Sequence, residues 1–281
     1  PTIEDKQNQT GDVPMLQEHC IPQQDIATTL ALQHYAPISL SKMGRVALLN
    51  RTDTKYVLSL ATLQRIMPQL TEVYAALVVQ GKRASHYRTL YFDSADFGLY
   101  HRHHAGMLDR YKVRAREYVD SHLAFLEVKH KTNKGRTIKS RMQTPELTDE
   151  IGAETAAFLQ DTIPFNPAQL EPKLWVEYDR ITLVSELRQE RVTIDLNLAF
   201  SWEDETVGLP QLVIVEVKQD GFSSQSEMIR LLRQNQVQPL GFSKYCLGVT
   251  LLFPQMKHNN FKSKLRLVQK LAQGQSHAYR H

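Results

Sequence analysis

The sequence predicts an α+β protein in which many antiparallel strands form a large β-barrel or sandwich with peripheral helices. Its 281 residues, 42% of them apolar, are enough to bury a large core. Many segments alternate apolar and polar side chains, the pattern of strands with one face on the core, whereas helical periodicity occurs in only a few places. So many antiparallel strands favour a barrel or a sandwich, because both architectures limit open sheet edges.

The predicted strands account for most of the patterned part of the chain. Runs of β-branched and aromatic residues mark them, and several alternate with period 2. In chain order they are Ala47–Leu58, His86–Asp93, Arg110–Val119, Leu123–Lys131, Arg136–Met142, Leu174–Val184, Arg191–Phe200, Gln211–Gln219 and Tyr245–Leu252.

Helical periodicity occurs in four other segments. They span 60–70, 148–160, 224–236 and a basic amphipathic stretch around 262–271. Ser59 is placed to cap the first helix, and Ser224 with Glu227 forms a capping box for the third. We expect the basic helix to pack on the protein surface rather than to dock on a membrane.

One domain spanning residues 36–272 is the simplest organisation. Residues 1–35 are rich in Gln, Asp and Thr and show little periodicity, so we expect a tail that is disordered or loosely docked. Residues 273–281 have the same character. The part between the tails has no Pro/Ser/Gly-rich linker and no internal repeat that would divide it.

Composition excludes several classes of protein. Charged residues make up 23% of the chain and the net charge is +4, both unlike a disordered or collagenous chain. No apolar run reaches the ~18 residues of a membrane-spanning helix. The two cysteines, Cys20 and Cys246, are too few for a disulfide framework or a structural zinc site, so we expect a reducing compartment, the cytoplasm.

Charged side chains recur on one face of the predicted strands. Because successive side chains point to opposite faces, Lys112, Arg114 and Arg116 share a face. The same parity groups cations in six other predicted strands. One of them is Arg191–Phe200, where Arg191, Thr193, Asp195 and Asn197 share a face. Carboxylates are interleaved on that face, chiefly at Asp53, Glu127, Asp195 and Glu216.

Two interpretations of this charged face remain. For a single strand, the simpler one is a sheet whose charged face lies in water. If the sheet closes, the charged face instead lines the interior, where unpaired buried charge is too costly for a dry core. The interior would then be a wet channel for a polyanion, with Arg and Lys on phosphate oxygens and carboxylates on Mg²⁺ or Mn²⁺.

Short motifs of this chain occur in the order seen in VTC domains. They are Arg51-x-Asp53-x-Lys55-Tyr56, Tyr91-Phe92-Asp93, Lys112-x-Arg114-x-Arg116, Glu127-x-Lys129, Tyr178-x-Arg180, Arg191-x-Thr193-x-Asp195, Glu216-x-Lys218 and Ser243-Lys244-Tyr245. Residues from about 38 to 252 therefore resemble the polyphosphate polymerase domain of the vacuolar transporter chaperone complex. That domain belongs to the triphosphate tunnel metalloenzymes, alongside CYTH-type triphosphatases and adenylyl cyclases.

The resemblance implies a closed antiparallel β-barrel, the triphosphate tunnel, which is basic inside and needs a divalent metal, Mn²⁺ or Mg²⁺. It implies a polyphosphate polymerase that transfers the terminal phosphoryl group of ATP to a growing polyphosphate chain. As catalytic residues it assigns Arg114, Arg116, Lys129 and Glu216, the last also as the metal ligand. As substrate-binding residues it assigns Arg51, Lys55, Lys139, Tyr178, Arg180, Arg191, Lys218, Ser243 and Lys244.

Two positions depart from relatives of this type. Triphosphatases of the superfamily open with Glu-x-Glu-x-Lys, and Arg51 in place of the first acid fits the VTC branch and argues against a two-metal hydrolase. The eukaryotic polymerase has a basic residue two positions before its Ser-Lys pair, where this chain has Gly241. That difference would weaken binding or shift the preferred chain length. The chain resembles the stand-alone prokaryotic members.

Three functions from different classes stay open at this point. They are the polymerase, a triphosphate hydrolase or nucleotidyl cyclase on the same tunnel, and a non-catalytic receptor for polyphosphate or another polyanion. Expected ligands are ATP or another nucleoside triphosphate, polyphosphate, pyrophosphate and triphosphate. Nucleic acid is disfavoured, because the net charge is modest and no series of stacking aromatics accompanies the cations. We expect His101, His103 and His104 in a solvent-exposed loop rather than at a metal.

Overall fold

A computed structural model describes residues 21–44, 51–220 and 225–273, without the side chain of Arg51. The strands are β1 (Ala36–Ile38), β2 (Arg51–Ser59), β3 (Ala75–Leu77), β4 (Ala84–Ser94), β5 (Arg110–Tyr118), β6 (Leu123–Lys131), β7 (Thr137–Thr144), β8 (Leu170–Ser185), β9 (Glu190–Trp202), β10 (Glu205–Leu209) and β11 (Leu212–Asp220). The α-helices are α1 (Gln23–Thr29), α2 (Leu40–Met43), α3 (Leu60–Ile66), α4 (Gly98–His104), α5 (Ala153–Thr162), α6 (Glu227–Gln234), α7 (Lys244–Leu252) and α8 (Lys262–Ala272). Short 3₁₀ helices occur at Leu32–His34, Met67–Leu70, Val119–Ser121, Pro167–Gln169 and Asn259–Phe261.

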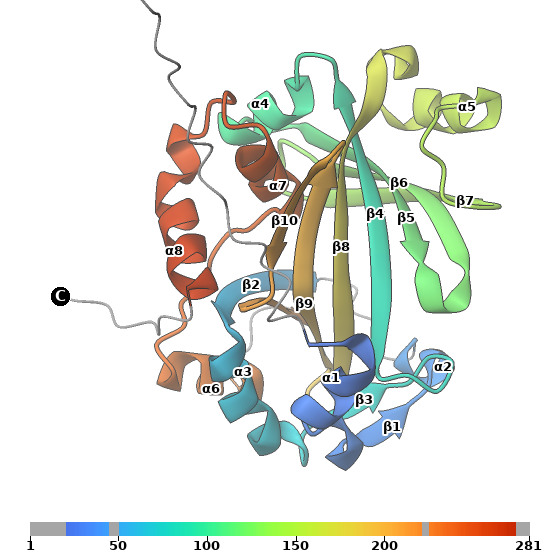
Figure 1. Cartoon of the computed structure of the whole chain (residues 1–281). Coiled ribbons are helices and arrows are strands. Elements are labelled where there is room, and N and C mark those ends of the chain that lie inside the picture. Colours follow the sequence, from blue (N-terminus) through green and yellow to red (C-terminus); the bar gives the residue numbers. More distant parts are fainter. Residues whose placement is uncertain (1–20, 45–50, 221–224, 274–281) are drawn as a thin grey trace, which may run out of the picture.

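One large sheet organises the molecule. Its main path runs β2-β11-β9-β8-β4-β5-β6-β7, and every pair of neighbours along it is antiparallel. Strands β10, β3 and β1 extend it locally, with β1 parallel to β3. The sheet curls so that β2 and β5–β7 lie behind β8 and β9 in Figure 1. The first eight predicted strands are confirmed; residues 47–50 of the first one lie outside the described residues.

The prediction of a closed barrel is not confirmed, because this sheet is open. Within the described residues, its end strands β2 and β7 do not pair with each other. A cavity lies between them, lined by Lys55 of β2 and Lys139 of β7 together with further cations. Like charges on the two edges oppose a closer approach. The antiparallel sheet with surrounding helices, the α+β class, is confirmed.

The predicted strand Tyr245–Leu252 is wrong, since these residues form α7. Ser243 caps this helix by accepting a hydrogen bond from the Cys246 N–H at 3.2 Å. An apolar run that is buried on nearly all sides carries no clear period of 2 or 3.6, so its pattern does not separate strand from helix. Gly248 allows close packing on the sheet, because a Cβ there would lie 2.6 Å from Phe200 Cδ1.

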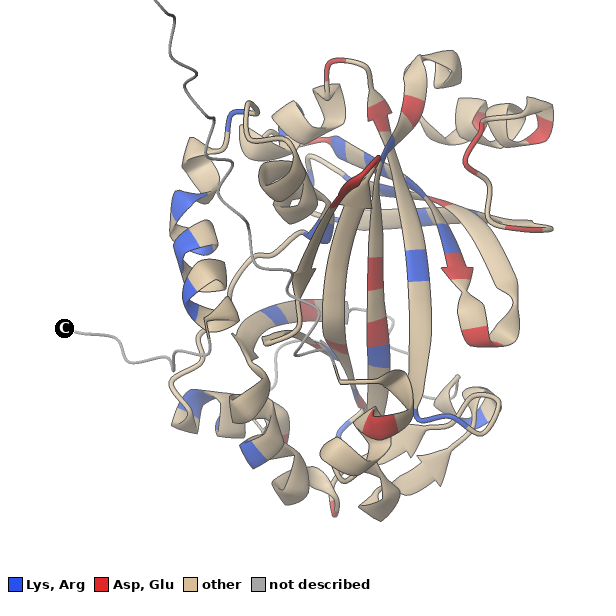
Figure 2. Cartoon of the chain, viewed as in Figure 1, with Lys and Arg blue, Asp and Glu red and all other residues tan. Residues whose placement is uncertain are grey.

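Helices cover the sheet on both faces. On the face that we call the outer face, α1, α3 and α6 pack over β2, β11, β9 and β8, and α5 packs over β5 and β6. On the inner face, α7 and α8 cover one end of the sheet, as Figure 1 shows. The rest of the inner face carries charged side chains, among them Arg114, Arg180 and Lys218. Figure 2 shows further Lys and Arg along α8. Among the described residues, no helix is long and apolar enough to cross a membrane.

The predicted caps of α3 and α6 and the predicted N-terminal tail can be compared with the structure. Ser59 caps α3 as predicted, with its Oγ accepting from the Thr62 N–H at 3.2 Å. The cap of α6 is Ser226, whereas the predicted cap Ser224 lies outside the described residues. Part of the predicted N-terminal tail is packed, since α1 buries Ile26 in the core of the outer face.

Candidate functional site

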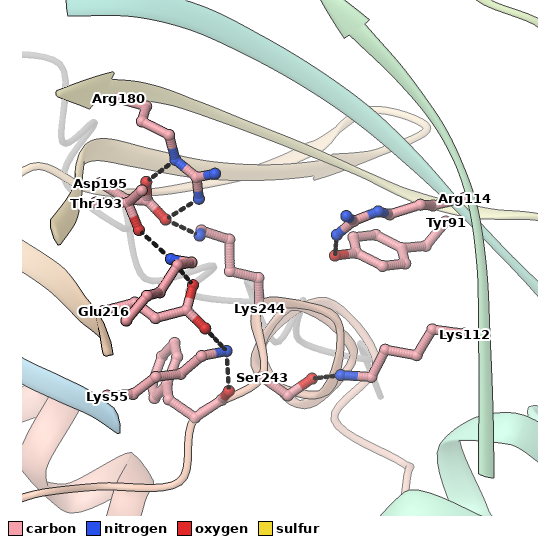
Figure 3. Close-up of polar contacts among 12 residues, drawn as sticks. Lys55, Tyr91, Lys112, Arg114, Arg180, Thr193, Asp195, Glu216, Ser243 and Lys244 are labelled. Atoms are coloured by element: carbon pink, nitrogen blue, oxygen red, sulfur yellow. Dashed lines mark hydrogen bonds and ion pairs between the residues drawn. The ribbon is translucent and has the colours of Figure 1, made fainter. Parts of the chain in front are cut away.

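Cations from opposite parts of the sheet meet on its inner face. Period-2 alternation points Lys112, Arg114 and Arg116 of β5 inward, and their cross-strand partners on β6 and β4 follow the same parity. Figure 3 shows Lys112 and Arg114 facing the side chains of β2, β8 and β9 across the inner space. The N-terminus of α7, with Ser243 and Lys244, projects between the two groups. Three ion-paired clusters result.

The first cluster joins β8, β9 and α7 around Asp195. Arg180 binds this carboxylate through two hydrogen bonds, Nε to Oδ1 at 2.6 Å and Nη2 to Oδ2 at 2.8 Å. Lys244 Nζ donates to the same Oδ2. Burial raises the pKa of Asp195, but Arg180 and Lys244 outweigh burial and hold that pKa well below its usual range. Asp195 is therefore the buried counter-ion of two predicted phosphate-binding residues.

The second cluster lies on β2 and β11 around Glu216. Lys218 Nζ is 2.6 Å from Glu216 Oε2 and also donates to Thr193 Oγ1 at 2.9 Å. Lys55 Nζ lies 3.7 Å from Glu216 Oε1 and donates to the Phe242 carbonyl at 3.4 Å. Burial opposes ionisation of Glu216, yet Lys218 and Lys55 hold its pKa far below its usual range. Glu216 is thus ionised and faces two ammonium groups.

The third cluster lies on β4, β5 and β6 around Glu127. Arg114 grips Glu127 Oε2 with Nε at 2.7 Å and Nη2 at 2.6 Å, and Arg116 Nη1 lies 3.7 Å from the same oxygen. Arg114 also donates to the Tyr91 hydroxyl at 3.3 Å, and Arg116 donates to Thr89 Oγ1 at 3.3 Å. Burial raises the pKa of Glu127, but the two arginines lower it to about 2. Both predicted catalytic arginines are thus held by one carboxylate.

A large cavity adjoins these clusters. Its volume is about 1500 Å³, and it lies between β2, the hairpin of β6 and β7, α7 and α8. Eight cationic residues line it: Lys55, Arg110, Lys112, Lys129, Lys131, Arg136, Lys139 and Lys264. Against them, the carboxylates in the lining are Asp53 and Glu216. The field in such a cavity favours a polyanion.

Tyr178 places a hydroxyl group among the inner cations. Its ring stacks on Tyr87 with centroids 5.2 Å apart, and Lys244 Nζ lies 4.1 Å from its ring centroid. Arg116 and Arg180 lie within 6.0 Å and 5.2 Å of the same centroid. The buried Tyr178 hydroxyl has no hydrogen-bond partner among the described residues. It can donate a hydrogen bond to an anion held by these cations.

Two lysines of the cavity have strongly perturbed ionisation. Burial, reinforced by Lys55 and other neighbouring cations, lowers the pKa of Lys129 to about 7. Burial and Lys55 also lower the pKa of Lys112 to about 8, although Cys246 acts in the opposite direction. Lys112 donates to Ser243 Oγ at 2.8 Å. Charging these amines costs free energy in the ligand-free fold. This cost disappears as the amines lose their protons. The free energy of unfolding therefore grows as pH rises through these values toward the ordinary lysine pKa of 10.5.

We expect the affinity for long-chain polyphosphate to fall as pH rises through about 7 and about 8, because a polyanion bound in the cavity favours the protonated lysines. Binding at neutral pH should take up protons, which calorimetry in two buffers of different ionisation enthalpy measures. The double variant Lys129→Arg/Lys112→Arg stays charged, so it should bind with a flatter pH profile, while titration of the ligand is common to both proteins. Identical profiles for the two proteins would contradict the assignment.

The structure brings together most of the predicted site residues. Those that line the cavity or join the three clusters are Lys55, Arg114, Arg116, Lys129, Lys139, Tyr178, Arg180, Glu216, Lys218, Ser243 and Lys244. Arg191 lies opposite Lys218 in the register of β9 and β11. The side chain of Arg51 lies outside the described residues.

Sequence reasoning missed several residues of the site. Lys112 belongs to the inward row of β5, and its spacing from Arg114 was the available signal. Glu127 and Asp195 belong to the interleaved carboxylates that the sequence predicts to hold a metal, whereas in the structure they are counter-ions of Arg114 and Arg180. Lys264 comes from α8, and no strand pattern pointed to it.

Two local predictions are wrong: the inward direction of Asn197 and the location of His101, His103 and His104 in an exposed loop. The register of β8 and β9 shifts between Glu177 and Asp179, so Asn197 points to the outer face and donates to Asp179 Oδ2 at 2.8 Å instead of following Asp195 inward. The three histidines lie in α4, not in an exposed loop. His104 is buried there, and burial together with Lys112 and Arg110 lowers the pKa of His103 to about 2 at the cavity wall.

Metal ligands are sparse at this site. Within the part of the chain that the structure describes, no group of three or more His, Cys, Asp or Glu side chains is arranged to hold a metal ion. Glu216 is the carboxylate nearest to the cavity lysines by ion pairing. Mg²⁺ and Mn²⁺ bind readily with one or two carboxylates when substrate phosphates complete the coordination shell. Glu216 therefore fits a metal that is shared with a phosphate ligand.

Comparison with known proteins places the chain in a family. A model of the VTC domain matches residues 50–253. No curated protein matches the sequence significantly. Solved structures with detectable similarity include a Vibrio parahaemolyticus protein that is provisionally assigned as an adenylate cyclase. It is 11% identical to this chain, the match covers 70% of this chain and 97% of that chain, and the TM-score is 0.41. HpAC1 from Hippeastrum, described as having a dominant triphosphatase activity, is 15% identical, with 70% and 94% covered and a TM-score of 0.42. A Pyrococcus horikoshii protein is 10% identical, with 73% and 99% covered and a TM-score of 0.42.

Proposed function

The chain belongs to the VTC domain family, and from this premise we propose that it is a metal-dependent polyphosphate polymerase that uses ATP. In this proposal the terminal phosphoryl group of ATP is transferred to the end of a polyphosphate chain on the inner face of the sheet. One observation carries the proposal: cations from β2, β5, β6, β8, β11 and α7 converge on one interior space beside a cavity lined by eight cations.

The chain's own residues supply binding and charge stabilisation. Phosphoryl transfer requires positioning and neutralisation of charge on the equatorial oxygens more than covalent chemistry. Arg114 and Arg180 would exchange their carboxylate partners for phosphate oxygens, to which the guanidinium fork is equally suited. The Tyr178 hydroxyl would donate to a phosphate oxygen, and the N-terminus of α7 with Lys244 would add positive charge.

Acceptor activation is simple in this scheme. The terminal phosphate of a polyphosphate chain is already anionic, so no general base has to remove a proton from it. Glu216, which forms ion pairs with Lys55 and Lys218, would hold a metal together with phosphate oxygens. When bound, Mn²⁺ or Mg²⁺ supplies charge neutralisation between neighbouring phosphates.

A single incubation tests the proposed function. The protein is mixed with ATP labelled in its terminal phosphate, Mn²⁺ and a short polyphosphate primer, and the products are separated on a gel and assayed for free phosphate. Labelled long chains support the polymerase. Free labelled phosphate without elongation indicates a hydrolase on the same site, and binding without turnover indicates a polyanion receptor. Either of these two results overturns the proposal.

A further inference from the structure

The two walls of the cavity differ in charge. The wall formed by β5, β6 and the hairpin to β7 carries most of its cations, namely Arg110, Lys112, Lys129, Lys131, Arg136 and Lys139. The opposite wall is formed by residues 239–243, α7 and the start of α8, and most of its side chains are apolar. Within the described lining of that opposite wall, Lys264 of α8 is the one cation.

Lys264 is held close to the loop that precedes α7. Its Nζ lies 4.0 Å from the position that a Cβ on Gly241 would take and 5.6 Å from the centroid of the Phe261 ring. Its side chain is half-buried, and it forms no ion pair with any carboxylate among the described residues. An ammonium group at a cavity wall without a carboxylate partner is available to an anionic ligand.

The cavity adjoins the inner clusters, but most of their arginines and lysines do not line it. Arg114, Arg116, Arg180, Lys218 and Lys244 do not line it. A triphosphate held by those residues would leave most of the 1500 Å³ for further phosphate units. Cations on both walls would then bracket a longer chain, with the lysines and arginines of the sheet on one side and Lys264 on the other.

We propose that Lys264 is a specificity-determining residue that contacts the phosphates of chains longer than triphosphate from the helix wall of the cavity. This inference rests on the proposed function, because it assigns the cavity to the polyphosphate chain. It makes the preference for long chains depend on α8, which lies outside the β-sheet. A ligand of only three phosphates, held by the inner clusters, should be nearly insensitive to this lysine.

The test compares two ligands on one variant. Lys264→Ala should weaken binding of a long-chain polyphosphate about tenfold, the effect of one charge-assisted hydrogen bond, and binding of tripolyphosphate less than about twofold. Both dissociation constants are measured by calorimetry at one ionic strength without metal. The matched control Arg266→Ala removes the same charge from an exposed position of α8 outside the cavity and should change neither constant.

A second variant separates charge from packing. Gly241 has no positive φ, and the nearest atom to an added Cβ is Lys264 Nζ itself, so Gly241→Lys in the Lys264→Ala background fits and returns an ammonium group to the same region. Recovery of long-chain affinity supports the proposal, because a packing role of Lys264 against Phe261 would not be restored. An equal loss for both ligands, or no recovery, overturns it. If the wild-type protein binds neither ligand, the proposed function itself fails.

Discussion

Replacing Arg114 and Arg116 together with methionine should abolish tripolyphosphate binding and also destabilise the fold. The loss of affinity should be at least about 100-fold, because each charged hydrogen bond to a phosphate is worth about 1.5–3 kcal/mol. The loss of stability follows from Glu127, which both arginines neutralise in a buried setting. Leaving a buried carboxylate without its partner typically costs about 3–5 kcal/mol. Calorimetry gives the affinity, and denaturant unfolding gives the stability.

Adding Glu127→Gln to this double variant separates the two effects. The triple variant removes the orphaned charge, so the free energy of unfolding should recover while tripolyphosphate binding stays lost. A triple variant that regains binding would show that the arginines act only by balancing Glu127. A double variant that remains folded and binds normally would exclude both residues from the phosphate site.

Glu216→Gln should remove metal-dependent turnover while sparing metal-free binding. The substitution keeps the shape of the side chain and removes the charge that would hold a divalent ion. Since a metal supplies several kcal/mol of charge stabilisation, turnover should fall at least about 100-fold. Binding of tripolyphosphate in the presence of a chelator should be unchanged or tighter, because Lys218 and Lys55 lose their competing carboxylate.

A titration of turnover with Mn²⁺, together with calorimetry in chelator, measures both effects of Glu216→Gln. The control Glu154→Gln removes an exposed carboxylate from the first turn of α5 and should leave both readouts unchanged. Full activity of Glu216→Gln at limiting Mn²⁺ would take this residue out of the metal role. Loss of metal-free binding would instead indicate that Glu216 organises Lys55 and Lys218 for the substrate.

The inward direction of the site residues could be predicted from parity alone along regular strands. Lys112, Arg114 and Arg116 point to one face because β5 has no bulge. The same argument failed at Asn197, where a register shift between β8 and β9 reverses the facing of the side chain. Such a shift depends on how two strands pair, which neither strand's own sequence reveals.

The sequence by itself determined the eight strands of the main path of the sheet, which of their faces carries charge and which family the chain belongs to. These properties rest on local alternation and on motif order, which short segments express on their own. Only the tertiary structure decided that Glu127 and Asp195 neutralise the inner arginines, since ion pairs join residues distant in sequence. It likewise decided that residues 244–252 form a helix, because their burial on nearly all sides erases the periodic signal. The sheet stays open between β2 and β7, and Lys264 of α8 lines the cavity. Both features follow from the packing of whole elements against one another, which local sequence patterns do not encode.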